Sequence, residues 1–404
     1  MPMLKNYNAF AGRHWETGSL HNALAYQGAK APHTGKPISE ALLLGISGGI
    51  TFGYFTFEYE GFLPHIALLT RNTFDPLDTI YDRLALPREV VQTPNAKKGE
   101  DNLLEALESG HPAIIRADIF SLPHYAYSEV RDMWAMMPMV VYGVEDGVAF
   151  LADRSGSPIT VPMETLTHAR SIIKKDKFRV MTLDAPDMSR LAPAVSKGIW
   201  QCISLFTEAP PKGAKNNFGL AALDHWAKML TNTRNKQSWA RYFEAGERLW
   251  MALAGDIVQP GAYTWLRHGQ GNSAERGMYA DFLDEAAQLL NKPDLTGVSA
   301  LYRESETLWD ALAEMLLPDY VPLLKETKNL LDRRARLYVE NGSQSTDERL
   351  EINERLKAIQ QTVTADFPMS ETEVMTFRER LAEQVLRIHD KEREAVECLQ
   401  SVMA

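Results

Sequence analysis

The sequence predicts an α+β domain followed by an all-α domain. Residues from about 12 to 185 show helical patterns first and short strand-like runs afterwards, the order expected of an α+β domain. The character of the chain changes near Ala185-Pro186, and from about residue 189 nearly every segment has a helical period. We therefore place an α+β domain at 10–186 and a helical domain at 189–404, with a charged helical tail from about 320.

Length, charge and cysteine content exclude several classes of protein. A chain of 404 residues is too long for one ordinary core. The net charge of −10 argues against binding of nucleic acid, which needs a basic surface. There is no run of 18 apolar residues and no signal-peptide pattern, so we expect no membrane span and a cytoplasmic location. Cys202 and Cys398 have no metal-like spacing, and no thiol precedes Cys202.

Two helices and a glycine-rich turn are expected at the start of the first domain. Apolar residues at helical spacing predict a helix over 17–27, with Thr17, Gly18 and Ser19 as capping residues. Ser39 reads as the N-cap of a second helix, which ends at glycines. The stretch 45–55 is glycine-dense and then β-branched and aromatic, which indicates a turn running into a strand.

The remaining elements follow in order. A short helix is expected at 103–107, and Glu145-Asp146-Gly147 reads as the turn of a β-hairpin. The expected strands are 111–118, 139–144, 148–153, 159–162 and 177–183. The expected helices are 220–230, 239–253, 274–290, 302–316 and 321–340, followed by a helical hairpin over 345–403. Residues 368–373 resemble an N-cap region, and the hairpin would pack on the domain or on a second subunit, giving a homodimer.

Several motifs of this chain resemble one known family and its companion domain. The first set is HWETGSL at 14–20, ISEALLLG at 38–45 and GGITFGY at 48–54, which resemble the N-terminal domain of the butirosin biosynthesis protein H family. The second set is NFGLAAL at 217–223 and RGMYADFLDEA at 276–286, which resemble the helical domain that often follows it. Together they cover most of residues 12–318, and the tail after 320 is not covered.

The resemblance implies a papain-like, transglutaminase-like domain that transfers an aminoacyl group from a carrier-protein thioester to an aminoglycoside amine. The family's cysteine nucleophile falls on Trp15, and its histidine falls on or near Pro138. Only the family's aspartate is kept, as Asp153. Cysteine catalysis needs a thiolate with a base in hydrogen-bond reach, so the acyl-enzyme route would be lost.

Three hypotheses follow, of which the first is preferred and the second is the alternative to it. In the first, a biosynthetic enzyme without a cysteine acts on an acyl or aminoacyl intermediate in amide formation, cleavage or cyclisation, with Trp15 as a pocket wall. Its proton carriers would be His14, Glu16, His124 or Asp153. In the second, the chain is a pseudoenzyme, a binding or scaffold partner in the pathway. In the third, only the nucleophile position has changed. The loss of the family's histidine at or near Pro138 weakens this hypothesis.

Each candidate residue also has a structural interpretation. His14 could cap a helix or lie at the surface, and Glu16 could favour a helix N-terminus through the macrodipole. His124 could be a packing residue of a loop, and Asp153 a turn residue or half of an ion pair. Thr17 and Ser19 carry hydroxyls, but they lie past the expected nucleophile position.

Substrate contacts are assigned to Gly48, Gly49, Tyr54, Tyr125 and Arg276. The glycines could bring backbone N–H groups to a ligand or could serve tight turns with positive φ. Arg276 could pair with an anionic ligand or could belong to the helical core. No His-Glu-x-x-His motif is present, so we expect no metal and no cofactor. The expected partner is a small-molecule or carrier-protein-bound acyl substrate.

Overall fold

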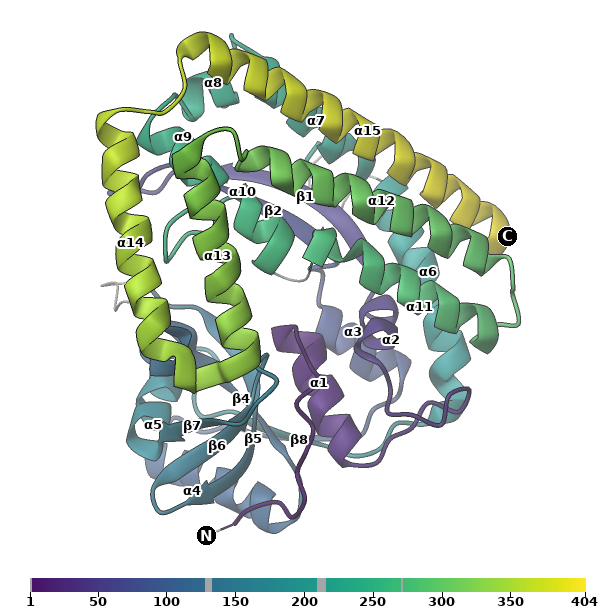
Figure 1. Ribbon diagram of the computed structural model, residues 1–404. Helices are drawn as coiled ribbons and strands as arrows, with labels where there is room; N and C mark the ends of the chain where they lie inside the picture. Colours follow the sequence, from purple (N-terminus) through teal and green to yellow (C-terminus); the bar gives the residue numbers. More distant parts are fainter. Residues whose placement is uncertain (1, 128–132, 209–215, 270–271) are drawn as a thin grey trace. The chain divides into compact units, whose positions relative to one another are not determined.

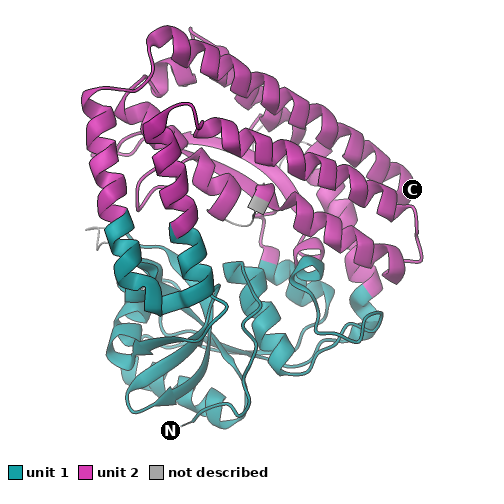
Figure 2. Cartoon of the chain, viewed as in Figure 1, with its two compact units in different colours: residues 1–43, 77–191, 334–352 teal, residues 44–76, 192–333, 353–404 magenta. Residues whose placement is uncertain are grey.

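The computed structural model describes residues 2–127, 133–208, 216–269 and 272–404, and the chain divides into two compact units (Figure 2). Unit 1 comprises residues 1–43, 77–191 and 334–352, and unit 2 comprises 44–76, 192–333 and 353–404. The change of unit at residue 191 lies close to the expected boundary. The expected domains were continuous, however, whereas each compact unit contains segments from both halves of the chain. The α+β class is confirmed.

An antiparallel sheet dominates unit 1 (Figure 1). Its order among the described residues is β3-β8-β4-β5-β6-β7. The strands are β3 (Arg88–Val91), β4 (Ala113–Asp118), β5 (Met136–Glu145), β6 (Val148–Ala152), β7 (Ile159–Pro162) and β8 (Val180–Leu183). The helical segments are α1 (Trp15–Tyr26), α2 (Glu40–Ile46, which continues into unit 2), α3 (Pro76–Arg83), α4 (Ala96–Glu108), η1 (Ile119–Ser121), η2 (Pro123–Tyr125), α5 (Met163–Ile172) and η3 (Met188–Arg190).

Local sequence accounts for several of these elements. Asp146 and Gly147 have φ of +48° and +76°, the left-handed pair that a tight hairpin turn between β5 and β6 needs. The side chain of Asn95 caps α4, accepting from the Lys98 N–H at 3.0 Å, so this helix is longer than expected. Ser39 Oγ accepts from the Leu42 N–H at 3.0 Å, which agrees with its expected role as a cap.

The start of α1 differs from the expected one. The helix begins at Trp15, and its N-cap is His14, whose Nδ1 accepts from the Glu16 N–H at 3.2 Å. The expectation that Thr17, Gly18 and Ser19 cap the helix is wrong, because all three lie within it. Because His14 has extended backbone and a side-chain acceptor two residues before Glu16, it fills the cap position itself.

Unit 2 combines a two-stranded antiparallel ribbon, β1 (Ile50–Phe57) and β2 (His65–Arg71), with many helices. They are α6 (Leu191–Thr207), α7 (Gly219–Thr231), α8 (Trp239–Tyr242), α9 (Glu247–Leu253), α10 (Ala262–Thr264), η4 (Trp265–Gly269), η5 (Asn272–Glu275), α11 (Arg276–Leu289), α12 (Leu295–Leu316), α13 (Pro322–Asn341), η6 (Gly342–Ser345), α14 (Thr346–Ala365) and α15 (Glu371–Met403). The last turns of α13, η6 and the start of α14 belong to unit 1.

Two expectations for the helical region need correction. The single helix expected at 239–253 is two short helices, because Gly246 has a φ of +115° between α8 and α9. The expected hairpin over 345–403 is displaced, since η6 joins α13 to α14 in a helical hairpin while α15 packs on α7 and α12 (Figure 1). Ser370 caps α15 in a capping box with Glu373, as expected. None of the described helices has the length and apolar character needed to cross a membrane.

Candidate functional site

The loop before α1 is held rigidly by one buried carboxylate. Glu40, in the first turn of α2, accepts hydrogen bonds from the Arg13 N–H at 2.7 Å, the His14 N–H at 2.9 Å and the Thr17 hydroxyl at 2.8 Å. Gly12 packs on Gly18 so closely that a Cβ on Gly12 would lie 2.3 Å from the Gly18 carbonyl oxygen. These contacts fix the position of Trp15 at the first turn of α1.

Trp15 packs between two side chains of unit 1. Its indole Nε1 donates to the Tyr125 hydroxyl at 3.3 Å. The Arg154 guanidinium carbon lies 3.6 Å from the centre of the indole ring, a cation–π contact. The position that the resemblance gives to the nucleophile therefore holds an indole in contact with a cation.

Asp153, directly after β6, is the centre of a cluster of side chains. The other members of this cluster are Trp15, His124, Tyr125, Arg154, Tyr338 and Arg349. Both Tyr125 and Tyr338 donate their hydroxyl protons to its Oδ2, with 2.6 Å from the Tyr338 oxygen. All three side chains are buried. Tyr338 lies on α13, 185 residues away in sequence, and sequence reasoning missed it because no motif in the tail marks it. The Tyr125 and Tyr338 rings also stack, with centroids 5.6 Å apart.

The surroundings of Asp153 favour its ionised form. Burial by itself would raise the pKa of this carboxyl, but His124, Arg154 and Tyr125 outweigh burial and bring the pKa down to about 2. Burial and the nearby Asp153 carboxylate raise the pKa of Tyr125 and of Tyr338 far above its usual range, so both stay protonated as donors. Burial opposes the charge of Arg154, yet the surrounding tyrosines and Asp153 raise the pKa of its guanidinium. The cluster is thus an ionised carboxylate beside a permanent cation.

His124 lies beside Asp153 but forms no hydrogen bond with it. Its Nε2 is 3.8 Å from Asp153 Oδ2, which exceeds hydrogen-bonding distance. Burial lowers the pKa of the imidazole, and the charges of Arg349 and Arg154 lower it further, against the opposing effect of Asp153. The ring is therefore neutral near pH 7. Neither of its nitrogens has a hydrogen-bond partner among the described residues, and the same holds for Asp153 Oδ1 and Arg154 Nε.

Arg349, on α14, holds the backbone at His124. It donates to the His124 carbonyl oxygen at 2.5 Å and to the Ser345 hydroxyl at 3.1 Å. Its guanidinium also lies 5.0 Å from the centre of the Tyr338 ring. Burial lowers the pKa of this guanidinium from its usual value. The tip of the α13–α14 hairpin thus contributes two buried residues to the cluster, and neither was expected from the sequence.

The structure separates the other candidates from this cluster. His14 caps α1, which agrees with its structural interpretation, and Glu16 stands in the first turn of the same helix. Pro138 lies in β5, where its carbonyl oxygen accepts from the Ser19 hydroxyl at 3.3 Å. Of the candidate residues, Trp15, His124, Tyr125 and Asp153 lie in one cluster, and their functional roles stay predictions.

Gly48, Gly49, Tyr54 and Arg276 lie in unit 2 and are packed against protein groups. Both glycines have positive φ, and a Cβ there would lie 2.7 Å from Gln201 or 2.6 Å from Tyr279, respectively. Tyr54 accepts from the Trp239 indole at 3.2 Å. Arg276 is 0% exposed and donates to both carboxylate oxygens of Glu392, at 2.7 and 3.0 Å. These contacts support the structural interpretation, and a role in substrate binding stays a prediction.

The described residues offer neither a reactive thiol at Cys202 nor a metal site. Cys202 is buried, its thiol donates to the Ile50 carbonyl oxygen, and burial raises the pKa of this thiol to about 12. A thiol with that pKa does not form the thiolate that nucleophilic attack requires near pH 7. Within the described ranges, no group of three or more histidine, cysteine, aspartate or glutamate side chains could hold a metal ion.

Comparison with known proteins gives a family match over part of the N-terminal half of the chain. Residues 14–154 match the family model described as butirosin biosynthesis protein H, N-terminal. The match begins one residue before Trp15 and ends one residue after Asp153, so it includes both positions. Tyr338 and Arg349 lie outside it. The search of curated proteins gives no match to this chain.

Proposed function

We propose that this chain, whose residues 14–154 match the butirosin biosynthesis protein H N-terminal family, is a non-catalytic binding or scaffold partner in natural-product biosynthesis. Its ligand would be an acyl or aminoacyl intermediate, free or bound to a carrier protein. The observation that carries the proposal is the contact of Trp15 with Arg154 and Tyr125. The residue at the family's nucleophile position is part of a packed cluster.

Three further observations support the loss of acyl transfer. An indole N–H can donate a hydrogen bond but cannot attack a thioester. The Asp153 oxygen that would orient a catalytic base accepts two tyrosine hydroxyls instead. The Cys202 thiol is buried and stays protonated. In this proposal the papain-like scaffold is kept, and buried polar contacts occupy the positions of the triad.

One observation favours a second candidate function, an enzyme that works without cysteine. The neutral His124 ring has no hydrogen-bond partner within the described chain, and Asp153 Oδ1 is also unpaired. A neutral imidazole beside a carboxylate is suited to accept a proton from a substrate amine. Because His124 is only 2% exposed, this function requires that the cluster open before a substrate can reach the ring.

A combined turnover and binding experiment distinguishes the two candidates. The protein is incubated with an aminoacyl-phosphopantetheinyl carrier protein and an aminoglycoside, and the products are followed by mass spectrometry. We expect acyl release at the rate found without the protein, and measurable binding of the acylated carrier by fluorescence anisotropy. If the wild type releases the acyl group faster and the Asp153→Asn variant does not, the protein is an enzyme. Absence of both binding and turnover would contradict the role in acyl-intermediate biosynthesis.

The oligomeric state and the location expected from the sequence remain predictions. A homodimer through the helical region predicts twice the mass of the 404-residue chain in light scattering after gel filtration. A cytoplasmic protein would be recovered in the cytosolic fraction of the producing cell.

A further inference from the structure

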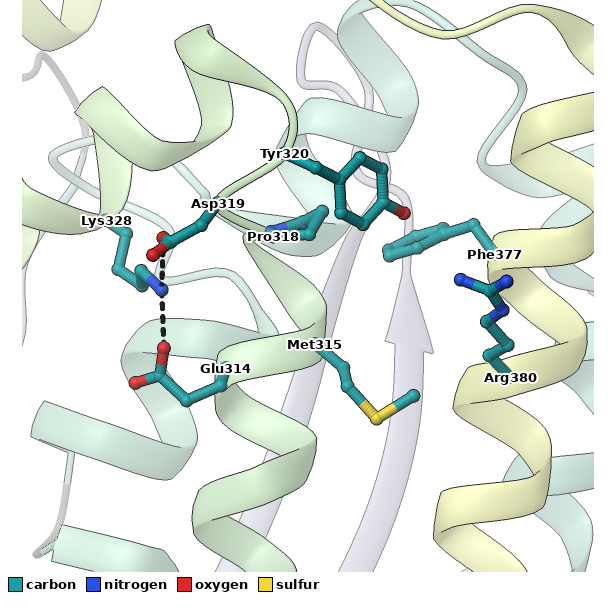
Figure 3. A pocket seen from close by; sticks show the side chains of 8 residues that line it. All are labelled: Glu314, Met315, Pro318, Asp319, Tyr320, Lys328, Phe377 and Arg380. Atoms are coloured by element: carbon teal, nitrogen blue, oxygen red, sulfur yellow. Dashed lines mark hydrogen bonds and ion pairs between the residues drawn. The ribbon is translucent and has the colours of Figure 1, made fainter.

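Unit 2 contains a pocket of about 320 Å³ between the end of α12, the following loop and α15 (Figure 3). Its volume lies at the lower end of the range of roughly 300–1,000 Å³ for small-molecule sites. The lining residues are Glu314, Met315, Pro318, Asp319, Tyr320, Lys328, Phe377 and Arg380. None of them belongs to the cluster around Asp153.

The middle of the pocket is apolar. Phe377 is buried, and Met315 and Pro318 lie in the same part of the pocket (Figure 3). The aromatic ring of Tyr320 stands at the side, with 65% of the residue exposed. A flat apolar ligand could lie against both the exposed ring of Tyr320 and the apolar surface beside it. Such a ligand would remove both from water.

The charges at the two ends of the pocket differ in their pairing. At one end the Lys328 ammonium lies between the carboxylates of Glu314 and Asp319, 2.8 Å from the Asp319 oxygen (Figure 3). Lys325 adds a further positive charge 3.8 Å from Asp319. The two acidic groups are therefore balanced by two lysines and do not require a cationic ligand.

Arg380 is the charge that remains unpaired at the other end. It is exposed on α15, one helical turn after Phe377, and no described residue forms a hydrogen bond or ion pair with its guanidinium. A guanidinium presents two parallel N–H groups that match a carboxylate or a sulfonate. The unpaired charge beside the apolar surface is thus suited to an anionic group on an apolar ligand.

We propose that this pocket binds a flat, apolar small molecule that carries one carboxylate or sulfonate. The ring system contacts Tyr320, Met315 and Phe377, and the anionic group pairs with Arg380. This site lies outside the family match at residues 14–154, and the inference does not depend on the proposed function of the Asp153 cluster.

The test uses two probes of almost equal shape, 2-naphthoate and the neutral 2-naphthamide, titrated into the full-length protein and followed by isothermal calorimetry. The variants are Arg380→Gln, Tyr320→Ala and the control Arg387→Gln, which changes another exposed arginine of α15. We expect Arg380→Gln to weaken naphthoate binding about tenfold, as for loss of one charge-assisted contact, and to leave naphthamide unchanged. Tyr320→Ala should weaken both probes, and Arg387→Gln neither.

Three outcomes would overturn the proposal. They are absence of naphthoate binding to the wild type, an equal effect of Arg380→Gln and Arg387→Gln, or unchanged binding of both probes by Tyr320→Ala. Because Arg380 and Tyr320 are exposed, both variants are expected to fold, which circular dichroism and a thermal unfolding curve will check.

Discussion

Replacing Asp153 by asparagine should lower the stability of the protein and also change how that stability depends on pH. Asparagine keeps the size of the side chain and an oxygen that can accept from Tyr125 and Tyr338. It removes the negative charge beside Arg154. The difference between the two proteins therefore reports on the ionised carboxylate rather than on packing.

The magnitude follows from the pKa of the carboxyl group. Its change from an ordinary value of 3.8 to about 2 corresponds to about 2.4 kcal/mol of unfolding free energy, at about 1.36 kcal/mol per pKa unit. Because the pKa is lower in the folded state, this stabilisation is present above about pH 5. It is lost as the pH falls through 4 towards 2. At pH 3 a little under half of it, about 1 kcal/mol, should be gone.

Urea unfolding at pH 7, 5, 4 and 3 measures this difference. We expect Asp153→Asn to unfold with about 2 kcal/mol less free energy at pH 7. Between pH 5 and pH 3 the wild type should lose about 1 kcal/mol more than the variant. The control is Asp146→Asn, which changes an exposed aspartate in the turn of the same hairpin and should follow the wild type. Parallel pH profiles for wild type and Asp153→Asn would refute the assigned ionisation of Asp153.

Two further changes test the contacts around this site and in unit 2. Tyr338→Phe removes one of the two hydroxyl donors to Asp153 and should lower the unfolding free energy by about 1.5–3 kcal/mol in urea titrations, while an unchanged midpoint would show that the Tyr338 hydrogen bond contributes nothing. Gly198→Ala should prevent folding or lower the melting temperature strongly, because its Cβ would lie 2.1 Å from the Gly45 carbonyl oxygen. The matched change Gly297→Ala, in α12 with no atom within 4 Å of the new Cβ, should stabilise by about 0.5–1 kcal/mol, and equal melting temperatures for the two variants would contradict the close helix packing at Gly198.

Elements that depend on neighbouring residues were predicted well. The hairpin of β5 and β6 follows from an Asp146-Gly147 turn between two apolar runs, and α15 begins at the capping box of Ser370. The prediction of one helix over 239–253 was wrong, and the cause is also local. The positive φ of Gly246 interrupts the helix, although the apolar residues continue at helical spacing. Local propensity and capping are written in contiguous residues, so sequence can show them.

The candidate site was predicted only in part. The family motifs identified Trp15 and Asp153, and the sequence alone established that no cysteine precedes residue 202. Two residues that contact this site lie far away in the sequence. Tyr338 is 185 residues from Asp153, and Arg349 is 225 residues from His124. Hydrogen bonds between such distant residues leave no periodic signal in a single sequence, because they depend on how separate elements pack.

The sequence by itself therefore determined the α+β class, the similarity of residues 14–154 to the butirosin biosynthesis protein H family and the absence of a thiol at the family's nucleophile position. The tertiary structure decided which side chains surround Trp15 at that position. In the folded chain, Arg154 contacts the Trp15 ring and two tyrosine hydroxyls donate to Asp153. Gly48, Gly49 and Arg276 pack within unit 2 instead. The physical reason is that the ionisation of a buried carboxylate depends on the charges and donors placed around it, and only the packed chain places them.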